Sequence, residues 1–293
     1  MHDDELAISA ALVRRLLAEQ LPDVAGRPLR EVGRGTVNAM FRLGDDLAVR
    51  LPRTAEWAGD LERERVWLPP LRERISLRVP EPVAEGRPTD EYPLPWAVYR
   101  WVDGDQYEDE LVADERGTAE ALARFVRELR AGPVEGGPAA GRRPLAVLDE
   151  VTRVAIVEAG DLLDTAAVLA AWDRALEAPV FAGDAVWIHT DLLRPNLLVQ
   201  GGRLAAVIDF GAVGVGDPAA DVIAAWTVFG AAGRARYREA LEVDDATWER
   251  SRGYALTQAA LIVPYYRETN PAFTASAQRT IGEVLADLAT RHT

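Results

Sequence analysis

The sequence predicts an α+β protein of two lobes, an antiparallel-sheet lobe over residues 1–102 and a mostly helical lobe over residues 103–293. Three observations support this division. Short apolar runs separated by turn residues fill positions 29–51, which is typical of antiparallel strands. Apolar residues at helical spacing dominate positions 115–131 and most of the chain after residue 147. Between these regions, Asp103-Gly104 breaks an apolar run and marks the boundary of the lobes.

The N-terminal lobe is expected to begin with an amphipathic helix that Pro22 and Gly26 end. The turn Gly44-Asp45-Asp46 predicts a hairpin between two strands. The pair Pro69-Pro70 is expected to kink or split a later, charged helix. The expected elements are a helix at 5–21, strands at 29–32, 39–43 and 47–51, a helix at 54–75, a connection at 78–95 and a strand at 95–102.

The C-terminal lobe is expected to be helical except for short strands around its polar motifs. Asp217 is a good N-cap, with Pro218 at the first helical position. The glycine- and proline-rich segment 131–144 is expected to be a mobile loop, and Pro264 to Pro271 to interrupt the last helices. The expected helices lie at 115–131, 147–177 (one or two helices), 218–228, 234–241, 247–261 and 278–292.

The composition is that of a globular protein in which every basic residue is arginine. The chain has 293 residues, 48% of them hydrophobic, and no lysine. It has no cysteine either, which excludes disulfides, thiolate metal sites and thiol nucleophiles. No segment reaches the ~18 uninterrupted apolar residues of a membrane span. The acidic N-terminus has no signal-peptide pattern, so we expect a cytoplasmic protein without a membrane partner.

The net charge of -14 is unevenly distributed. Residues 1–100 hold 17 acidic residues and 15 arginines, whereas residues 101–293 hold 30 acidic residues and 18 arginines. This acidic C-terminal part argues against nucleic acid and anionic membranes as partners, and it suits a cationic small substrate. A solvated acidic surface explains the same charge equally well.

Three oxygen-bearing side chains follow or connect short apolar runs. An apolar run leads into His189-Thr190-Asp191, Asn196 comes after four further residues, and Asp209 ends a later run. Phosphoryl transfer needs such a set: a carboxylate to orient and deprotonate a hydroxyl, and an amide and a carboxylate to hold magnesium on the phosphates. The sequence therefore predicts Asp191 as the catalytic residue and Asn196 and Asp209 as Mg²⁺ ligands.

Candidate phosphate ligands lie in the N-terminal lobe. Gly33 and Gly35 stand in a turn between two strands, where backbone N–H groups and the Thr36 hydroxyl are expected to contact phosphate. Any hairpin can carry such glycines. Arg50 comes after an apolar triplet on the third strand, where a guanidinium can bind phosphates in a bidentate manner. Its alternative role is that of an exposed strand residue.

Further residues are expected to support the nucleotide. Among the acids of the helix at 54–75, Glu64 is expected to hold Arg50, and a surface pair one helical turn apart is the alternative. Tyr99 and Trp101 precede the lobe boundary, where the backbone is expected to pair with a nucleotide base. Both aromatic rings would also suit the core. Asp221 either favours its helix dipole or accepts N–H groups of the loop that carries Asp191.

Taken in order and spacing, these motifs resemble the aminoglycoside phosphotransferase family, whose small-molecule kinases share a fold with protein kinases. The motifs are His189-x-Asp191-x4-Asn196, Asp209-Phe210-Gly211 and Gly216-Asp217-Pro218-x-x-Asp221, and similarity extends over essentially the whole chain. The resemblance implies a bilobal protein-kinase-like fold, with nucleotide binding in the first lobe and catalysis and acceptor binding in the second. It further implies that the γ-phosphate of ATP (or GTP) passes, with Mg²⁺, to a hydroxyl of an aminoglycoside-like antibiotic.

The chain departs from the family pattern at three positions. Arg50 replaces the usual lysine, Thr190 stands where glycine is frequent, and Arg194 stands where a small or aromatic residue is usual. Arg194 either stabilises charge on the transferring phosphate or points to solvent.

The acceptor is the least defined part of the predicted function. Candidate contacts to it, each with an alternative as a surface or core residue, are Asp217, Trp226, Tyr265, Tyr266 and Glu268. Two alternatives remain: a kinase of another hydroxylated metabolite or antibiotic, such as a macrolide, a choline-like amine or an amino alcohol, and a nucleotide-binding regulator without catalysis.

Overall fold

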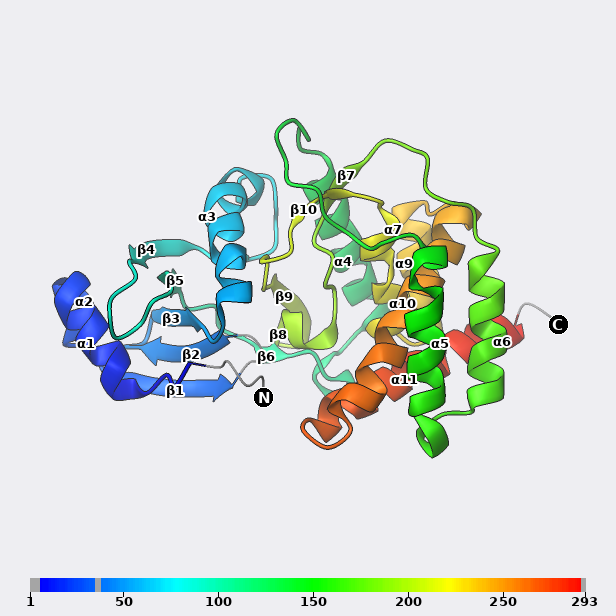
Figure 1. Ribbon diagram of the computed structural model, residues 1–293. Coiled ribbons are helices and arrows are strands. Elements are labelled where there is room, and N and C mark those ends of the chain that lie inside the picture. The colour runs from blue at the N-terminus through cyan, green and yellow to red at the C-terminus, as the bar shows by residue number, and fades with distance from the viewer. Residues whose placement is uncertain (1–5, 35–37, 291–293) are drawn as a thin grey trace. The chain divides into compact units, whose positions relative to one another are not determined.

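The computed structural model describes residues 6–34 and 38–290 (Figure 1). The chain divides into two compact units. Unit 1 comprises Met1–Gly104 together with Ala206–Ala212, and unit 2 comprises Asp105–Ala205 and Val213–Thr293. The motif Asp209-Phe210-Gly211 therefore belongs to unit 1, although it comes after the Asp191 loop of unit 2 in sequence. Among the described residues, no helix is both long and apolar enough to cross a membrane.

Unit 1 is built on a five-stranded antiparallel sheet of order β1-β2-β3-β5-β4. Its elements are α1 (Ala10–Gln20), α2 (Pro22–Ala25), β1 (Leu29–Arg34), β2 (Asn38–Leu43), β3 (Leu47–Pro52), the 3-10 helix η1 (Ala55–Trp57), α3 (Ala58–Arg72), β4 (Pro82–Gly86) and β5 (Trp96–Arg100). The predicted hairpin between β2 and β3 is confirmed, with Leu43 opposite Leu47 and Gly44 at a φ of 63°.

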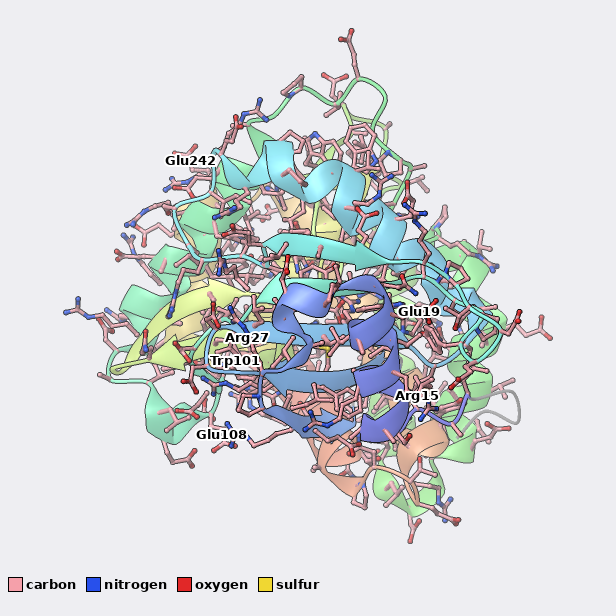
Figure 2. All side chains as sticks on the ribbon, turned by 90° about the vertical axis from the view of Figure 1, so that its left-hand side faces the viewer. Arg15, Glu19, Arg27, Trp101, Glu108 and Glu242 are labelled. Carbon is pink, nitrogen blue, oxygen red and sulfur yellow. The ribbon has the colours of Figure 1, made fainter. Side chains whose placement is uncertain are left out.

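The core of unit 1 lies between the sheet and α1. Strand β3 is buried along its whole length because it lies between β2 and β5. Helix α1 buries Leu12, Val13 and Leu16 in the same apolar cluster as the strands. Its other face carries exposed residues such as Arg15 and Glu19 (Figure 2). This rigid sheet fixes the position of the side chains on β3.

Three local predictions for unit 1 need refinement. The segment at 78–95 is not only a connection, because it forms the edge strand β4. Proline is tolerated at the first position of an edge strand, and a Cβ at Gly86 would lie 1.7 Å from the Trp96 ring. Helix α3 runs through Pro69-Pro70, where only the bonds of its last turn are lost. The first helix ends before Pro22 as predicted, and Pro22 also begins the short α2.

Unit 2 is mostly helical. Its helices are α4 (Glu115–Arg130), α5 (Asp149–Glu158), α6 (Thr165–Leu176), α7 (Ala219–Val222), α8 (Ala224–Thr227), α9 (Ala231–Leu241), α10 (Asp245–Tyr266) and α11 (Pro271–Thr290), with 3-10 helices η2 (Asp109–Leu111), η3 (Leu145–Leu148), η4 (Gly160–Leu162) and η5 (Arg194–Asn196). Its strands are β6 (Asp105–Gln106), β7 (Val186–Ile188), β8 (Leu197–Gln200) and β10 (Gly214–Gly216), and β9 (Arg203–Val207) continues into unit 1.

The short strands of unit 2 carry the polar motifs. Strand β7 pairs with β10 in antiparallel fashion and ends directly before His189. Strand β8 lies between β6 and β9, and begins directly after Asn196. The loops that contain the motifs are thus fixed at both ends by strand pairing.

Three predictions for unit 2 need correction, two about helices and one about a loop. The region at 218–228 forms two short helices instead of one. Helix α10 continues through Pro264, because a proline near the helix end removes only one backbone bond. The segment at 131–144 is not simply a mobile loop, since Ala139 forms a parallel bridge with Val215 of β10.

Candidate active site

In unit 1, Arg50 lies between two carboxylates. It points from β3 toward α3, where its Nη1 donates to Glu64 Oε2 at 2.7 Å, and both side chains are buried. Its Nη2 donates to Asp209 Oδ1 at 3.2 Å. The predicted pairing of Arg50 with Glu64 is confirmed, and the alternative of an exposed strand residue is wrong because Arg50 is only 7% exposed.

The surroundings of Arg50 keep it charged. Burial alone would lower the pKa of the guanidinium, but the carboxylates of Glu64 and Asp209 outweigh burial and raise it. The Asn38 amide, in the orientation that satisfies both groups, accepts from Arg50 Nε at 3.0 Å. The Arg50 guanidinium is thus held in place and always charged, and the two carboxylates neutralise part of its charge. A planar cation of this kind is suited to binding phosphate oxygens.

Glu64 organises the region around Arg50. In addition to the ion pair, its Oε2 accepts from the Tyr99 hydroxyl at 2.7 Å, and its Oε1 accepts from Phe210 N at 2.7 Å. The pKa of Tyr99 is raised by burial and by the neighbouring Glu64 charge. Tyr99 is therefore a buried support of Glu64, and its contribution to nucleotide binding stays a prediction.

Asp209 has a backbone conformation that is unusual for a non-glycine residue, with a φ of 66°. Gly211 lies two residues further on, and a Cβ there would lie 2.8 Å from the Cβ of Asp60 on α3. Burial raises the pKa of Asp60 to about 6, while the Arg50 cation lowers it and the Asp209 charge raises it. Asp60 is among the acids of this helix that the sequence offers as partners of Arg50, but nothing local separates it from the other acids of α3.

In unit 2, amide donors hold both carboxylate oxygens of Asp191. Asn196 Nδ2 donates to Asp191 Oδ2 at 2.8 Å and to its carbonyl at 2.9 Å. Gln258 Nε2 on α10 donates to Asp191 Oδ1 at 3.3 Å. The carboxylate is therefore oriented by two neutral side chains before any substrate arrives, which is the arrangement that a proton acceptor requires.

The backbone that precedes Asp191 is braced by the buried Asp221. Thr190 has a φ of 75°, and its N–H donates to Asp221 Oδ1 at 2.8 Å. The N–H of His189 donates to both Asp221 oxygens at 3.0 Å. His189 is buried, and its Nδ1 accepts from Asp191 N at 3.3 Å. Of the two alternatives for Asp221, the one in which it accepts N–H groups of the loop that carries Asp191 is confirmed, and His189 fixes the same loop by hydrogen bonding.

Arg142 is a residue of the site that sequence reasoning missed. Its Nη2 donates to Thr190 O at 3.1 Å and to Gln258 Oε1 at 2.9 Å. Arg142 lies in a segment whose composition is typical of a loop, so no local signal indicates it. A signal for Gln258 does exist, because it is one of few polar residues in the apolar stretch of α10 from Ala255 to Val263.

The predicted magnesium ligands fit the metal in chemistry. Asn196 uses its amide nitrogen for Asp191, which leaves the amide oxygen for a metal. Asp209 contributes a carboxylate whose side chain is 41% exposed. Both are oxygen donors, which Mg²⁺ prefers, and phosphates and water usually complete its coordination. Within residues 6–34 and 38–290, no cluster of three or more acidic or histidine side chains is placed to hold a metal.

The remaining nucleotide candidates are less well supported. Gly33 lies in β1, whereas Gly35 and Thr36 fall outside the described residues, so their contact with phosphate stays a prediction. Trp101 directly follows β5 (Figure 2). Its backbone N–H donates to Asp46 O at 2.8 Å, and the Arg42 guanidinium lies 4.6 Å from the centre of its ring. The backbone N–H of Trp101 and one face of its ring therefore already contact residues of unit 1.

Two of the candidate acceptor contacts have structural roles instead. Asp217 is buried and forms an ion pair with Arg250, whose Nε lies 2.8 Å from Asp217 Oδ2. It also caps the start of the next helix by accepting from Ala219 N. Trp226 is fully buried, and its ring centre lies 4.5 Å from that of Trp248. Both assignments to the acceptor are wrong because these side chains are sequestered in the core.

The other three candidates lie at the end of α10. Tyr265 is 60% exposed, and its ring meets that of Tyr266 at a centroid distance of 4.7 Å. Tyr266 in turn contacts Phe273 of α11, with ring centroids 5.2 Å apart. Glu268 is exposed in the next turn. These positions are accessible, so contact with an acceptor stays a prediction for all three.

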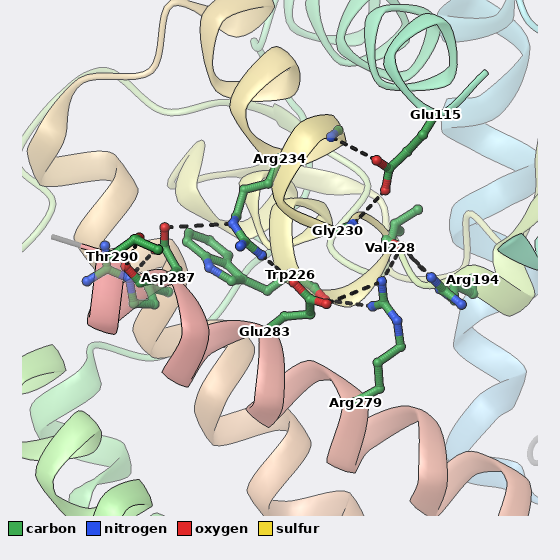
Figure 3. A network of polar contacts seen from close by, with 12 residues as sticks. Glu115, Arg194, Trp226, Val228, Gly230, Arg234, Arg279, Glu283, Asp287 and Thr290 are labelled. Carbon is green, nitrogen blue, oxygen red and sulfur yellow. Dashed lines mark hydrogen bonds and ion pairs between the residues drawn. The ribbon is translucent and has the colours of Figure 1, made fainter. Parts of the chain in front are cut away.

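Arg194 is held in a polar network within unit 2 (Figure 3). Its Nη2 donates to Val228 O at 2.8 Å and to Asp109 Oδ1 at 2.6 Å. Arg279 donates to the same Val228 carbonyl at 3.1 Å. The two arginines thus cap the C-terminal end of α8, where cations are favourable. Neither sequence alternative for Arg194, phosphate stabilisation or pointing to solvent, describes this position.

Comparison with known proteins places these features in a family. The model of the phosphotransferase enzyme family (APH) matches residues 28–254. Wild-type aminoglycoside 2'-phosphotransferase-IIIa, solved as a GDP complex, is 21% identical with a TM-score of 0.77, over 96% of this chain and 100% of that chain. The gentamicin complex of APH(2")-IIa is 16% identical with a TM-score of 0.63, over 96% of this chain and 99% of that one.

A macrolide phosphotransferase is also similar. Macrolide 2'-phosphotransferase MphH from Brachybacterium faecium is 20% identical with a TM-score of 0.60, over 92% of this chain and 97% of that chain. A comparison with curated proteins found no match. At these identities the structural similarity establishes the fold, and it confirms the predicted α+β fold of the protein-kinase type.

Proposed function

Because the chain belongs to the phosphotransferase enzyme family, we propose that it transfers the γ-phosphate of ATP or GTP to a hydroxyl of a small, hydroxylated, cationic acceptor of the aminoglycoside type. The observation that carries this proposal is the Asp191 carboxylate, which Asn196 and Gln258 orient through both of its oxygens. A carboxylate held in this way serves to orient a hydroxyl and accept its proton.

The reaction divides between the residues of the two units. In unit 1, Arg50 binds phosphate oxygens and Glu64 keeps its guanidinium in one orientation. In unit 2, Asp191 accepts the proton of the acceptor hydroxyl as the hydroxyl oxygen bonds to the γ-phosphorus. The bond between that phosphorus and the β–γ bridging oxygen breaks, and the nucleoside diphosphate leaves. When bound by Asn196 and Asp209, Mg²⁺ would neutralise charge on the phosphates.

Substitution of Asp191 tests the assignment directly. Asp191→Asn removes the proton acceptor and keeps the size of the side chain, so transfer should fall by about 10²-fold or more. Nucleotide affinity should stay within about twofold of wild type, because it depends on Arg50 and the other groups that bind the phosphates. Isothermal titration with a non-hydrolysable nucleotide and a phosphate-transfer assay measure the two quantities. Wild-type turnover in this variant would refute the role of Asp191.

The acceptor class rests on weaker support. The acidic excess of residues 101–293 suits a polycationic sugar. Two of the similar structures are complexes of those proteins with gentamicin and with kanamycin. A macrolide is the second candidate, because two macrolide 2'-phosphotransferases have the same fold.

Nucleotide consumption with a panel of acceptors separates these candidates. The panel contains aminoglycosides, macrolides, choline-like amines and amino alcohols, each tested with ATP and with GTP. We expect aminoglycosides to give the highest rate. If another class of acceptor is turned over fastest, the proposed acceptor class is wrong, but the protein is still a phosphotransferase. Nucleotide binding without consumption under every acceptor would favour a regulator that has lost catalysis.

A further inference from the structure

The segment that carries Arg142 is fixed by pairing with β10. Ala140 N donates to Val215 O at 3.0 Å, and Val215 N donates to Pro138 O at 2.8 Å. The approach is close enough to require glycine in β10, because a Cβ at Gly216 would lie 2.2 Å from Ala140 O. The backbone two residues before Arg142 therefore has a defined position, which a free loop would not give.

From this position Arg142 contacts the neighbourhood of Asp191 in two ways. Its Nη2 donates to the carbonyl of Thr190, the residue directly before Asp191. The same Nη2 donates to Gln258 Oε1, and Gln258 Nε2 donates to Asp191 Oδ1. A glutamine amide has one accepting end and one donating end. A cation at the accepting end therefore forces the donating end to face Asp191.

The energetics indicate that stability alone does not explain Arg142. Burial lowers the pKa of its guanidinium, so the cation is poorly solvated. Its Nε is buried and has no hydrogen-bond partner among the described residues. Arg142 is half-buried, and a charged group with a buried, unsatisfied donor is costly, so an apolar side chain of similar volume would often be more stable. Such a group is more easily explained by a task at the site it adjoins.

We propose that Arg142 is a positioning residue for Asp191 that acts through Gln258 and the carbonyl of Thr190. This inference rests on the proposed function, because it assumes that Asp191 accepts the proton of the acceptor. Arg142 fixes the rotamer of the Gln258 amide, and Gln258 fixes Asp191 Oδ1. Together with Asn196 on Oδ2, this holds the carboxylate plane in one orientation.

The test is a double-mutant cycle with Arg142→Met and Gln258→Leu, which keep the approximate volume and remove the polar groups. Each single variant should lower kcat by about 10- to 100-fold, because a small misorientation of a catalytic group has effects of this size. The Km for nucleotide should not change. The effect of the double variant should be smaller than the product of the two single effects, because the substitutions share the contact between Arg142 and Gln258. Rates are measured as phosphate release from ATP or GTP, with water as the acceptor, and as transfer to the best acceptor of the panel.

The matched control is Arg143→Met, which removes the neighbouring, exposed arginine of the same segment and should retain the wild-type kcat. Multiplicative effects of the two substitutions, or a wild-type kcat in Arg142→Met, would overturn the inference. If Arg142→Met does not fold, as judged by circular dichroism, a wild-type kcat in Gln258→Leu overturns it and a reduced kcat at unchanged nucleotide Km supports it. Wild-type turnover of Asp191→Asn would instead refute the proposed function, so the two failures are distinguishable.

Discussion

Asp221 supports the backbone at one of two strained residues of the candidate site. Thr190 has a φ of 75° without being glycine, a conformation that costs of order 1–3 kcal/mol. The fully buried Asp221 accepts the N–H groups of Thr190 and His189 and so offsets this cost. The acid is thereby coupled to the position of Asp191, although it lies thirty residues later in sequence.

Substitution of Asp221 should therefore affect both stability and activity. Asp221→Ala leaves two buried N–H groups unpaired, and we expect a loss of about 2–4 kcal/mol in the free energy of unfolding. Urea denaturation measures this loss. At a temperature where the variant is folded, kcat should also fall. Asp244→Ala is a control, because it removes an acid that caps α10 through Thr247 N and leaves this loop intact. An Asp221→Ala protein as stable as wild type would contradict the bracing role.

The raised pKa of Asp60 predicts that the stability of the fold depends on pH. Its pKa is raised from 3.8 to about 6 in the folded protein, mainly by burial, so the folded state binds this proton more tightly than the unfolded state. The favourable contribution of the protonated form is present below the unfolded pKa of 3.8. It is lost as the pH rises through about 6. Above that pH the ionised carboxyl destabilises the fold.

Asp60→Asn should remove this pH-dependent penalty. We expect the variant to be more stable than wild type by about 1–2 kcal/mol at pH 8, and the advantage to shrink toward pH 4. Urea denaturation at both pH values, without nucleotide or metal, measures the difference. Glu56→Gln is the matched control, since Glu56 is an exposed acid shortly before α3. An advantage of the Asn variant that is equal at both pH values would show that titration is not its cause.

At the scale of elements, the pairing of residues 138–140 with β10 connects the segment of Arg142 to the antiparallel pair of β7 and β10. Strand β10 pairs on its other side with β7, which ends before His189. Gly216→Ala should push the segment away, because the new Cβ would lie 2.2 Å from a backbone oxygen that cannot yield as a side chain does. We expect a loss of about 1–3 kcal/mol in stability and a reduced kcat.

The change in the segment can be measured apart from stability. Hydrogen exchange at Ala140 N, which donates to Val215 O, should become faster in Gly216→Ala than in wild type. Gly282→Ala on α11 is the control, because a Cβ there meets nothing within 4 Å. Unchanged protection of Ala140 in the Gly216 variant would contradict the predicted displacement.

The elements also show which features local sequence signals can predict. Strands β2 and β3 and the ion pair of Arg50 with Glu64 were predictable, because a hairpin turn fixes the register and only a few acids lie on the next helix. Strand β4 was not, because proline and glycine dominate its segment and its partner β5 lies beyond a turn. Arg142 and Gln258 are 116 residues apart, and no local pattern links two residues at that separation.

At the scale of the whole molecule, the order of the polar motifs predicted the family, whereas burial decided the acceptor candidates. The motif residues are defined by spacing, which a single sequence displays. Asp217 and Trp226 depend on packing, and only the structure shows that Arg250 pairs with one and Trp248 covers the other. The choice of acceptor depends on the summed charge of many residues and on exposed side chains. The spacing of motif residues in the sequence describes neither of these.

The net charge of -14 leads to a prediction about ionic strength. Negative potential around residues 101–293 should attract a polycationic acceptor, and salt should screen this attraction. Between about 20 mM and about 200 mM salt the Debye length falls from roughly 20 Å to roughly 7 Å. The Km of a polycationic aminoglycoside should therefore rise about threefold or more over this range, at constant kcat. For a neutral or singly charged acceptor of the panel, the Km should change much less. A polycationic acceptor whose Km does not respond to salt would mean that the acidic residues only solvate the surface, and that hydrogen bonds and shape determine acceptor affinity.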